Sequence, residues 1–152
     1  MSEIIKEIDA EISNILSELR NKYGINANYY LAYVKNSNYI ALYSKELNAI
    51  IFNLDVLVRF WKTNKQLTKK VLKPIIYHEY YHFLRGNGYT VIANKVLKVV
   101  YPSMFMSFSR FKILPFRFWE EINANKFMKK SGMSSKEVNK TLKELELEYL
   151  KL

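Results

Sequence analysis

The stretch Tyr77-His78-Glu79-Tyr80-Tyr81-His82 contains the only two histidines of the chain. On a helix, residues four apart lie one above the other on the same face, so His78 and His82 can direct two imidazoles at one point. Two imidazoles in this arrangement can chelate a metal ion such as zinc. Glu79 lies at the edge of that face, where a carboxylate can deprotonate a water on the metal without being a ligand. We interpret this stretch as half of a metal site.

The composition is that of a folded protein. The chain has 152 residues, 49% of them hydrophobic and 25% charged, which is close to the average for globular domains and enough for a hydrophobic core. We expect residues 1–152 to form a single domain. There is no cysteine, which excludes disulfides and thiolate metal sites, so any metal must be held by nitrogen and oxygen atoms.

The net charge of +10 raises the question of an anionic partner. A solvated, lysine-rich surface is the simpler interpretation, and nucleic acid remains open as a partner. The densest lysine cluster lacks the interleaved aromatic residues of a single-stranded nucleic-acid platform; it comprises Lys62, Lys65, Lys69, Lys70 and Lys73. The first residues are acidic where a signal peptide would be basic, and the apolar stretch 91–108 is interrupted by lysines and Pro102. We therefore predict a cytoplasmic protein without a transmembrane segment.

The order of predicted elements is that of an α+β domain. Apolar residues at helical spacing predict an amphipathic helix over residues 3–20, ended by Asn21 to Gly24. Three segments rich in strand formers follow, at residues 29–35, 39–43 and 49–52. Because Asn36-Ser37-Asn38 is typical of a turn, we predict that the first two segments form a hairpin in a small antiparallel or mixed sheet.

The third strand segment directly precedes the helical region that leads to the histidines. At a sheet edge beside the metal, its free N–H and C=O groups could pair with an extended peptide. We predict a substrate-binding edge strand that includes Asn48, Ala49, Ile50 and Ile51.

The second half of the chain is predicted to be mainly helical. A short helix is expected over 54–61, and a central helix over 68–85, with Pro74 suited to a first turn. Residues 89–100 can form a helix, residues 101–117 are interpreted as loop or irregular strand, and residues 119–130 are helical. Ser134 and Glu137 form a capping box that begins a final helix.

A catalytic zinc site requires a third protein ligand, which in this chain must be a carboxylate. Asp55 is one candidate, and the pair Glu120 and Glu121 is a better one because their helix can pack beside the histidine helix. A zinc-bound imidazole also needs an acceptor for its other N–H, and a residue one turn after the third ligand can supply it. Glu121 has Asn125 at that position, whereas Glu120 has an alanine. We therefore predict Glu121 as the ligand and Asn125 as its supporting residue.

Two motifs together resemble those of a known family. His78-Glu79-x-x-His82, followed by Glu121-x-x-Ala124-Asn125-x-Phe127, is similar to the pattern of the gluzincin zinc peptidases. The sequence of the second motif looks especially like that of the small cytosolic ImmA/IrrE-type peptidases and the archaeal minigluzincins. The resemblance covers residues 49–128 and leaves out the helices at both ends. Two departures are the tyrosines Tyr80 and Tyr81, where small residues are usual, and the basic aromatic segment before residue 118.

The resemblance implies a zincin-like domain with a three- to four-stranded sheet, an active-site helix and a second, ligand-bearing helix. It implies that Zn²⁺ is held by His78, His82 and Glu121, that Glu79 is the general base, and that Asn125 orients a histidine. The expected activity is hydrolysis of a protein or peptide substrate by an endopeptidase.

Stabilisation of the oxyanion formed during hydrolysis needs a further hydrogen-bond donor. Several residues are chemically able to provide it, and the sequence does not choose among them; they are Tyr77, Tyr89, Tyr101, Arg110 and Arg117. The alternative function is a basic nucleic-acid-binding or regulatory protein whose zinc site is structural or vestigial. Such a protein would bind DNA in a strongly salt-dependent manner and cleave no protein.

Overall fold

The computed structural model describes residues 2–85 and 114–152, with the backbone alone described for 114–120. This part of the chain is an α+β structure, as predicted, with five α-helices and one small mixed sheet. The elements in chain order are α1 (Glu3–Tyr23), β1 (Tyr29–Ala32), β2 (Ala41–Ser44), β3 (Ala49–Asn53), α2 (Leu54–Thr63), α3 (Lys65–Arg85), α6 (Leu114–Met128), the short 3₁₀ helix η2 (Lys129–Ser131) and α7 (Ser135–Leu150).

The sheet has the strand order β1-β3-β2, so β3 is its central strand. β1 runs parallel to β3, and β2 runs antiparallel to it with Tyr43 opposite Ile50. The predicted hairpin between the first two strand segments is therefore wrong. The hairpin joins β2 to β3 through a tight turn in which the Asn48 N–H donates to the carbonyl of Lys45, with Asn48 in the left-handed region at φ 46°.

Asn53 explains why the chain crosses the sheet after β1 instead of turning back. Its side chain is fully buried, and its amide nitrogen donates to the carbonyl oxygens of Val34 and Tyr39. Its Oδ1 accepts hydrogen bonds from the backbone N–H groups of Val34 and Asp55. This single amide ties the crossing loop to the end of β3 and the start of α2.

The prediction that Asn48 to Ile51 form an edge strand is also wrong, because β3 is hydrogen-bonded on both sides. Burial gives the physical reason: Ala49, Ile50 and Phe52 are fully buried, as expected for an apolar strand inside a sheet. Among the described strands, the two edges are β1 and β2.

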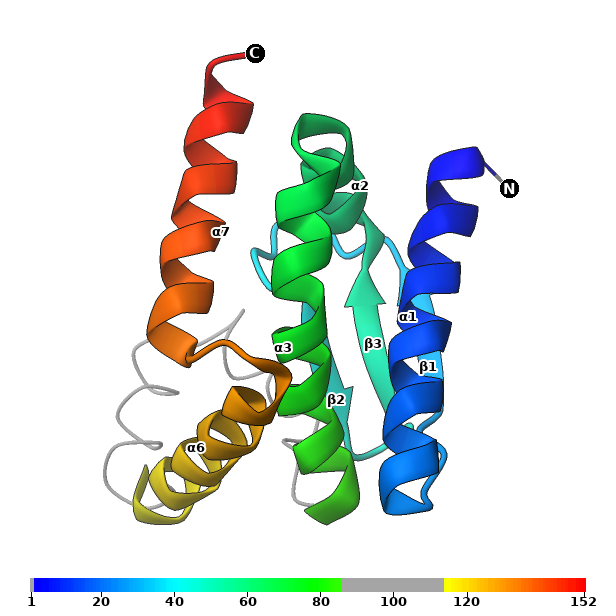
Figure 1. Ribbon diagram of the computed structural model, residues 1–152, viewed down its shortest axis with the longest axis vertical. Helices are drawn as coiled ribbons and strands as arrows, with labels where there is room; N and C mark the ends of the chain where they lie inside the picture. Colours follow the sequence, from blue (N-terminus) through cyan, green and yellow to red (C-terminus); the bar gives the residue numbers. More distant parts are fainter. Residues whose placement is uncertain (1, 86–113) are drawn as a thin grey trace.

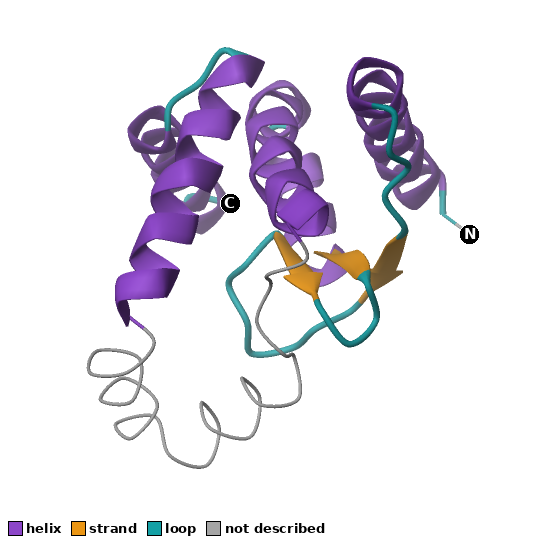
Figure 2. Ribbon diagram, turned by 90° about the horizontal axis from the view of Figure 1, so that it is seen from below, coloured by secondary structure: helices purple, strands orange, loops and turns teal. Residues whose placement is uncertain are grey.

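The helices α1 and α3 lie on the same face of the sheet (Figures 1 and 2). The apolar stripe of α1 was predicted correctly: Ile8, Ile12 and Leu19 are fully buried in a core that also includes β3 and α3. Gly24 ends α1 at φ 77°, a conformation that favours glycine. No helix in the described ranges is both long and apolar enough to cross a bilayer.

The central helix α3 begins earlier than predicted and continues through Pro74. Asn64 caps it by accepting a hydrogen bond from the Leu67 N–H on its side-chain oxygen. Pro74 is therefore an interior residue that removes one helical hydrogen bond, and it is not the first turn.

The helix α6, which carries the predicted ligand Glu121, begins at Leu114, so residues 114–117 are helical where a loop was expected. Pro115 lies in the first turn, where a proline is tolerated. The predicted helix 89–100 and most of the segment 101–117 lie outside the described residues. The predicted capping box is present, with Ser134 and Glu137 bonding reciprocally at the start of α7.

Candidate metal centre

Three side chains converge on one point between α3 and α6, and they are the three predicted ligands. His78 Nε2 lies 3.2 Å from His82 Nε2 and 3.1 Å from Glu121 Oε2, and His82 Nε2 lies 3.0 Å from Glu121 Oε1. The imidazoles are largely buried, and the Glu121 side chain is 39% exposed. This cluster of two nitrogen donors and one carboxylate can hold a metal ion.

Helical geometry and aromatic packing bring the cluster together. His78 and His82 are one turn apart on α3, as their spacing predicted. Figure 1 shows α6 lying obliquely beside the lower part of α3, and Glu121 of α6 reaches both histidines. Phe127 of α6 holds this arrangement, because its ring lies against three tyrosines of α3 at centroid distances of 5.8 to 6.4 Å; these are Tyr77, Tyr80 and Tyr81. Large residues at positions 80 and 81 thus pack against the ligand-bearing helix.

Glu79 is held next to the cluster by the sheet. Its Oε2 accepts a hydrogen bond of 2.9 Å from the backbone N–H of Tyr43, in the edge strand β2. Tyr43 is itself fixed, because its hydroxyl donates to Asn48 and its ring lies edge-on to Phe83. The Glu79 carboxylate is thereby oriented without taking the position of a ligand.

The two carboxyl groups of the site have opposite pKa shifts. Burial raises the pKa of Glu79, although the neighbouring histidine charges and the Tyr43 N–H act against this. Burial also acts to raise the pKa of Glu121, but hydrogen bonds with His78 and His82 and their charges lower it well below its usual value. The Glu121 carboxyl is therefore ionised in this cluster, and Glu79 is the more basic of the two carboxylates.

Asn125 and His78 line the same cavity but are not hydrogen-bonded to each other. The Nδ1 atom of His78 is buried and has no hydrogen-bond partner among the described residues, so the Asn125 amide does not bond to it. Asn125 is one turn from Glu121 on α6. That Asn125 orients a histidine is thus not seen at His78 and stays a prediction for His82.

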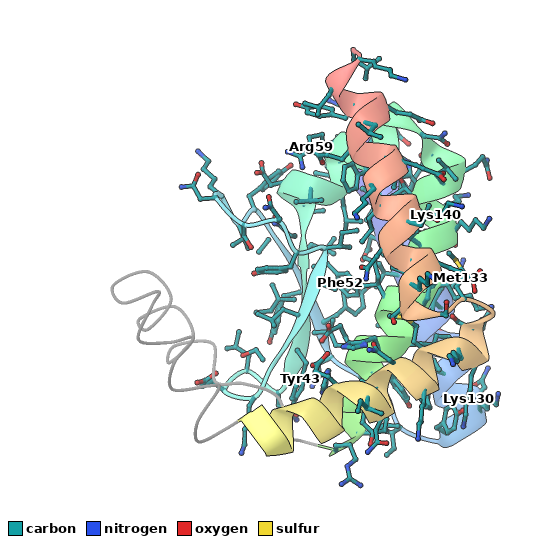
Figure 3. All side chains as sticks on the ribbon, turned by 90° about the vertical axis from the view of Figure 1, so that its left-hand side faces the viewer. Tyr43, Phe52, Arg59, Lys130, Met133 and Lys140 are labelled. Atoms are coloured by element: carbon teal, nitrogen blue, oxygen red, sulfur yellow. The ribbon has the colours of Figure 1, made fainter. Side chains whose placement is uncertain are left out.

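The cluster opens into a cavity of about 380 Å³. Its wall is formed by α3, α6, the first two turns of α7 and the chain that enters β2. His78, Glu79, Glu121 and Asn125 all contribute to this wall. The helices α6 and α7, which flank the cavity, face the viewer in Figure 3.

The other predicted site residues are elsewhere. Asp55 is exposed at the start of α2 and is not part of the metal cluster. Tyr77 is buried against Phe127 and does not line the cavity, so it is not placed to stabilise an oxyanion. The side chains of Glu120 and Arg117, both in α6, lie outside the described part of the structure. Three further predicted donors lie wholly outside it, backbone included; these are Tyr89, Tyr101 and Arg110.

Sequence reasoning missed two contributors to the site. One is the backbone N–H of Tyr43, which orients Glu79 and has no signature in the sequence because every residue except proline carries this group. The other is α7, whose residues Val138 and Leu142 line the cavity. Their apolar spacing was visible, but it did not distinguish a cavity wall from ordinary core packing.

Comparison with protein-family models, curated proteins and solved structures gives no match for this chain. What the protein does must therefore be inferred from the metal cluster, the cavity and the residues around them.

Proposed function

We propose that this protein is a zinc-dependent endopeptidase of the gluzincin type with a zincin-like fold. The observation that carries the proposal is the convergence of His78, His82 and Glu121 beside a cavity, which is lined by His78, Glu121 and the oriented carboxylate of Glu79. Three protein ligands with an accessible cavity are characteristic of catalytic zinc sites, whereas structural zinc sites are closed by a fourth ligand.

The donor set and its spacing fit zinc. Two imidazole nitrogens and a carboxylate are common zinc ligands, with bonds of about 2.0–2.1 Å. In a tetrahedral site with such bonds, two ligand atoms lie about 3.3 Å apart. The two imidazole Nε2 atoms are 3.2 Å apart, close to this value, and the Glu121 carboxylate approaches them with a different oxygen each, at 3.0 and 3.1 Å. When bound, zinc would lower the pKa of a water molecule and polarise the carbonyl of a peptide bond.

Glu79 is the group that moves the proton. Its raised pKa suits a general base near neutral pH, and the Tyr43 N–H occupies only one of its two oxygens. The other oxygen is available to take a proton from the attacking water. The same carboxyl group then gives this proton to the leaving amine as the peptide bond breaks.

The edge strand β2 is the element to which we assign the backbone of the substrate. Tyr43 donates its N–H to Glu79 and not to β3, so its backbone groups point away from the sheet. In an antiparallel pair, every second residue of a strand points its N–H and C=O the same way. The N–H and C=O of Ala41, two residues before Tyr43, therefore lie on the same outer edge of β2. Ala41 also lines the cavity. An extended peptide can pair with these groups by strand addition, which assigns to β2 the role first predicted for β3.

Replacing Glu79 tests the proposal. Glu79→Gln keeps the shape of the side chain but removes the base, so we expect the variant to bind zinc and to lose at least about 10²-fold in casein cleavage. Zinc content is measured by mass spectrometry of the metal, and cleavage by the release of peptides. A variant with full zinc content and full activity would refute the role of Glu79, and a wild-type protein that cleaves nothing would refute the proposed function.

The alternative of nucleic-acid binding depends on the net charge of +10, and several of the clustered lysines are engaged within the protein. Of the five lysines in the cluster, Lys65 and Lys73 pair with Glu7 and Glu18 of α1 at 3.1 and 3.6 Å, and Lys69 lies over the ring of Trp61. Lys65 and Lys73 thus join α3 to α1, and Lys69 joins α3 to α2. Salt-dependent DNA binding without any protease activity would nevertheless restore the alternative.

A further inference from the structure

The cavity at the metal cluster extends past the ligands to α7, a helix outside the motifs that define the proposed peptidase. We propose that this extension binds an apolar side chain of an extended peptide, next to the bond that is cut, and that Val138 and Leu142 of α7 determine this preference. The inference rests on the proposed function and specifies its substrate class.

The inner wall of the extension is apolar and comes from four separate elements. Ile40, Met128 and Val138 are buried, with 3 to 5% of each residue exposed, while Ile75 and Leu142 are half-buried. All five line the cavity. A side chain placed among them exchanges water for apolar contacts, which stabilises a leucine-sized group by about 1.5–3 kcal/mol.

Among the described residues, the wall offers no free partner for a charged substrate side chain. The acidic residues of the described part that line the cavity are Glu79 and Glu121, and both already contact other groups of the protein. No lysine or arginine of the described residues lines it. An aspartate or lysine side chain entering this space would lose its hydration without gaining an ion pair, which is unfavourable.

Three asparagines, Asn38, Asn125 and Asn139, stand around the apolar wall. Within the described part of the chain, none of their side-chain amides bonds to another protein group. Amides both donate and accept, so they can bond to the N–H and C=O groups of a peptide whatever its sequence. This arrangement selects for one apolar side chain while tolerating variation around it.

The volume and position of the cavity agree with this assignment. About 380 Å³ lies within the range of sites that hold a small ligand, and it accommodates one side chain with its adjoining backbone. Ile75 is one turn before His78 and Glu79 on α3, so the apolar extension and the metal cluster are adjacent along the same helix. A side chain in the extension therefore belongs to a residue close to the scissile bond.

Peptides that differ at the cut site test the preference. Cleavage sites in casein are mapped by mass spectrometry, and capped nonapeptides around one site carry Leu, Asp or Lys at each of the two flanking positions. At one of these positions we expect kcat/KM for Leu to exceed that for Asp and Lys by about 10- to 100-fold. Equal rates for the three residues at both positions would overturn the inference and leave the proposed function intact. Failure of the zinc-loaded wild type to cleave any site would contradict both.

Leu142 is the residue to change, because it is half-buried and can be replaced without emptying the core. Leu142→Glu should lower kcat/KM for the Leu peptide by at least about 10-fold and raise that for the Lys peptide. Leu142→Ala, a milder change, should shift the preference from Leu toward Phe. The matched control is Leu147→Glu, on the same helix but 59% exposed and outside the cavity, which should leave the preference unchanged.

A binding measurement separates recognition from catalysis. In zinc-loaded Glu79→Gln protein, the Leu peptide should bind at least about 10-fold more tightly than the Asp peptide by fluorescence anisotropy, and Leu142→Glu should remove this difference. If both Leu142 variants keep the wild-type preference in rate and in binding, α7 does not determine specificity and the inference is wrong.

Discussion

Glu121 is the residue that turns a pair of histidines into a three-ligand cluster. Its carboxylate reaches both Nε2 atoms at 3.0 and 3.1 Å, one oxygen to each. We expect Glu121→Ala to lose bound zinc, because two imidazoles alone make a weak site, and Glu120→Ala to retain it. Metal stoichiometry of the two purified variants is the measurement. Zinc loss in Glu120→Ala with retention in Glu121→Ala would reverse the assignment.

A second residue-scale prediction concerns Tyr29, whose hydroxyl donates to Asp9 of α1 at 2.7 Å. Burial, together with the hydrogen bond and charge of Asp9, raises the pKa of Tyr29 to about 12. In the unfolded chain a tyrosine has a pKa of about 10, so this contribution to stability is complete below about pH 10 and is lost as the pH rises to about 12.

The comparison is between wild type and Tyr29→Phe. From about pH 9 to about pH 12, wild type should lose about 1–2 kcal/mol more free energy of unfolding than the variant, after allowance for the partial exposure of this side chain. Urea denaturation at both pH values measures the difference. The raised pKa values of Tyr43 and Tyr80 affect both proteins alike and cancel. If both proteins lost the same free energy of unfolding, Tyr29 would ionise as easily in the folded protein as in the unfolded chain.

The residues of the site could be predicted to the extent that chemistry and helical spacing limit the choice. With two histidines and no cysteine, the ligands His78 and His82 followed from scarcity, and Glu121 followed from the need for a carboxylate. The lack of a hydrogen bond between Asn125 and His78 could not be predicted, because spacing places a residue on a helix face but does not specify its rotamer.

At the scale of elements, the crossing of α3 and α6 determines whether the ligands meet. Phe127 is the contact that fixes it, with its ring among Tyr77, Tyr80 and Tyr81. Phe127→Ala should cost about 3–5 kcal/mol in stability by opening a cavity, and it should weaken zinc binding because α6 is no longer held against α3. Chemical denaturation and a competition titration with a zinc-binding dye measure the two effects.

The matched control is Lys126→Ala, one residue earlier on α6, where the side chain is exposed. This variant should change stability by no more than about 0.5 kcal/mol and leave zinc affinity as it is. Loss of zinc affinity in both variants alike would indicate that any change to α6 disturbs the ligands, and that the aromatic contact has no special part in positioning them.

The strand order shows where element-scale prediction failed. The segments themselves were found, since alternating or continuous apolar residues identify strands. The order in which the strands pair depends on Asn53. Its buried amide bonds to Val34 and Tyr39, in a loop that lies far from it along the chain. A turn signal at Asn36 to Asn38 is local, and a local signal does not reveal such a distant contact. The unbroken apolar run of β3 was the available indication of a central strand.

At the scale of the whole molecule, the N-terminal helix packs on the elements that carry the site. Glu7 of α1 accepts from Trp61 Nε1 at 2.8 Å and pairs with Lys65, while Ile8 and Ile12 are fully buried. The hydrophobic core cluster extends from α1 through β3 and α3 to α7. The metal cluster lies at the side of this core, between α3 and α6, so a metal ion there would cross-link two elements that otherwise meet through side-chain packing.

Zinc binding should therefore be visible in global stability. A ligand that binds only the folded chain stabilises it by about 4 kcal/mol at a free concentration 1,000-fold above Kd, which for a protein of this size raises Tm by roughly 8–16 °C. We expect this shift in wild type and in Glu79→Gln, its reversal by a chelator, and its absence in Glu121→Ala, in which α6 supplies no ligand. Differential scanning calorimetry with and without zinc measures it. An equal shift in Glu121→Ala would mean that zinc binds elsewhere, or that the two histidines suffice without α6.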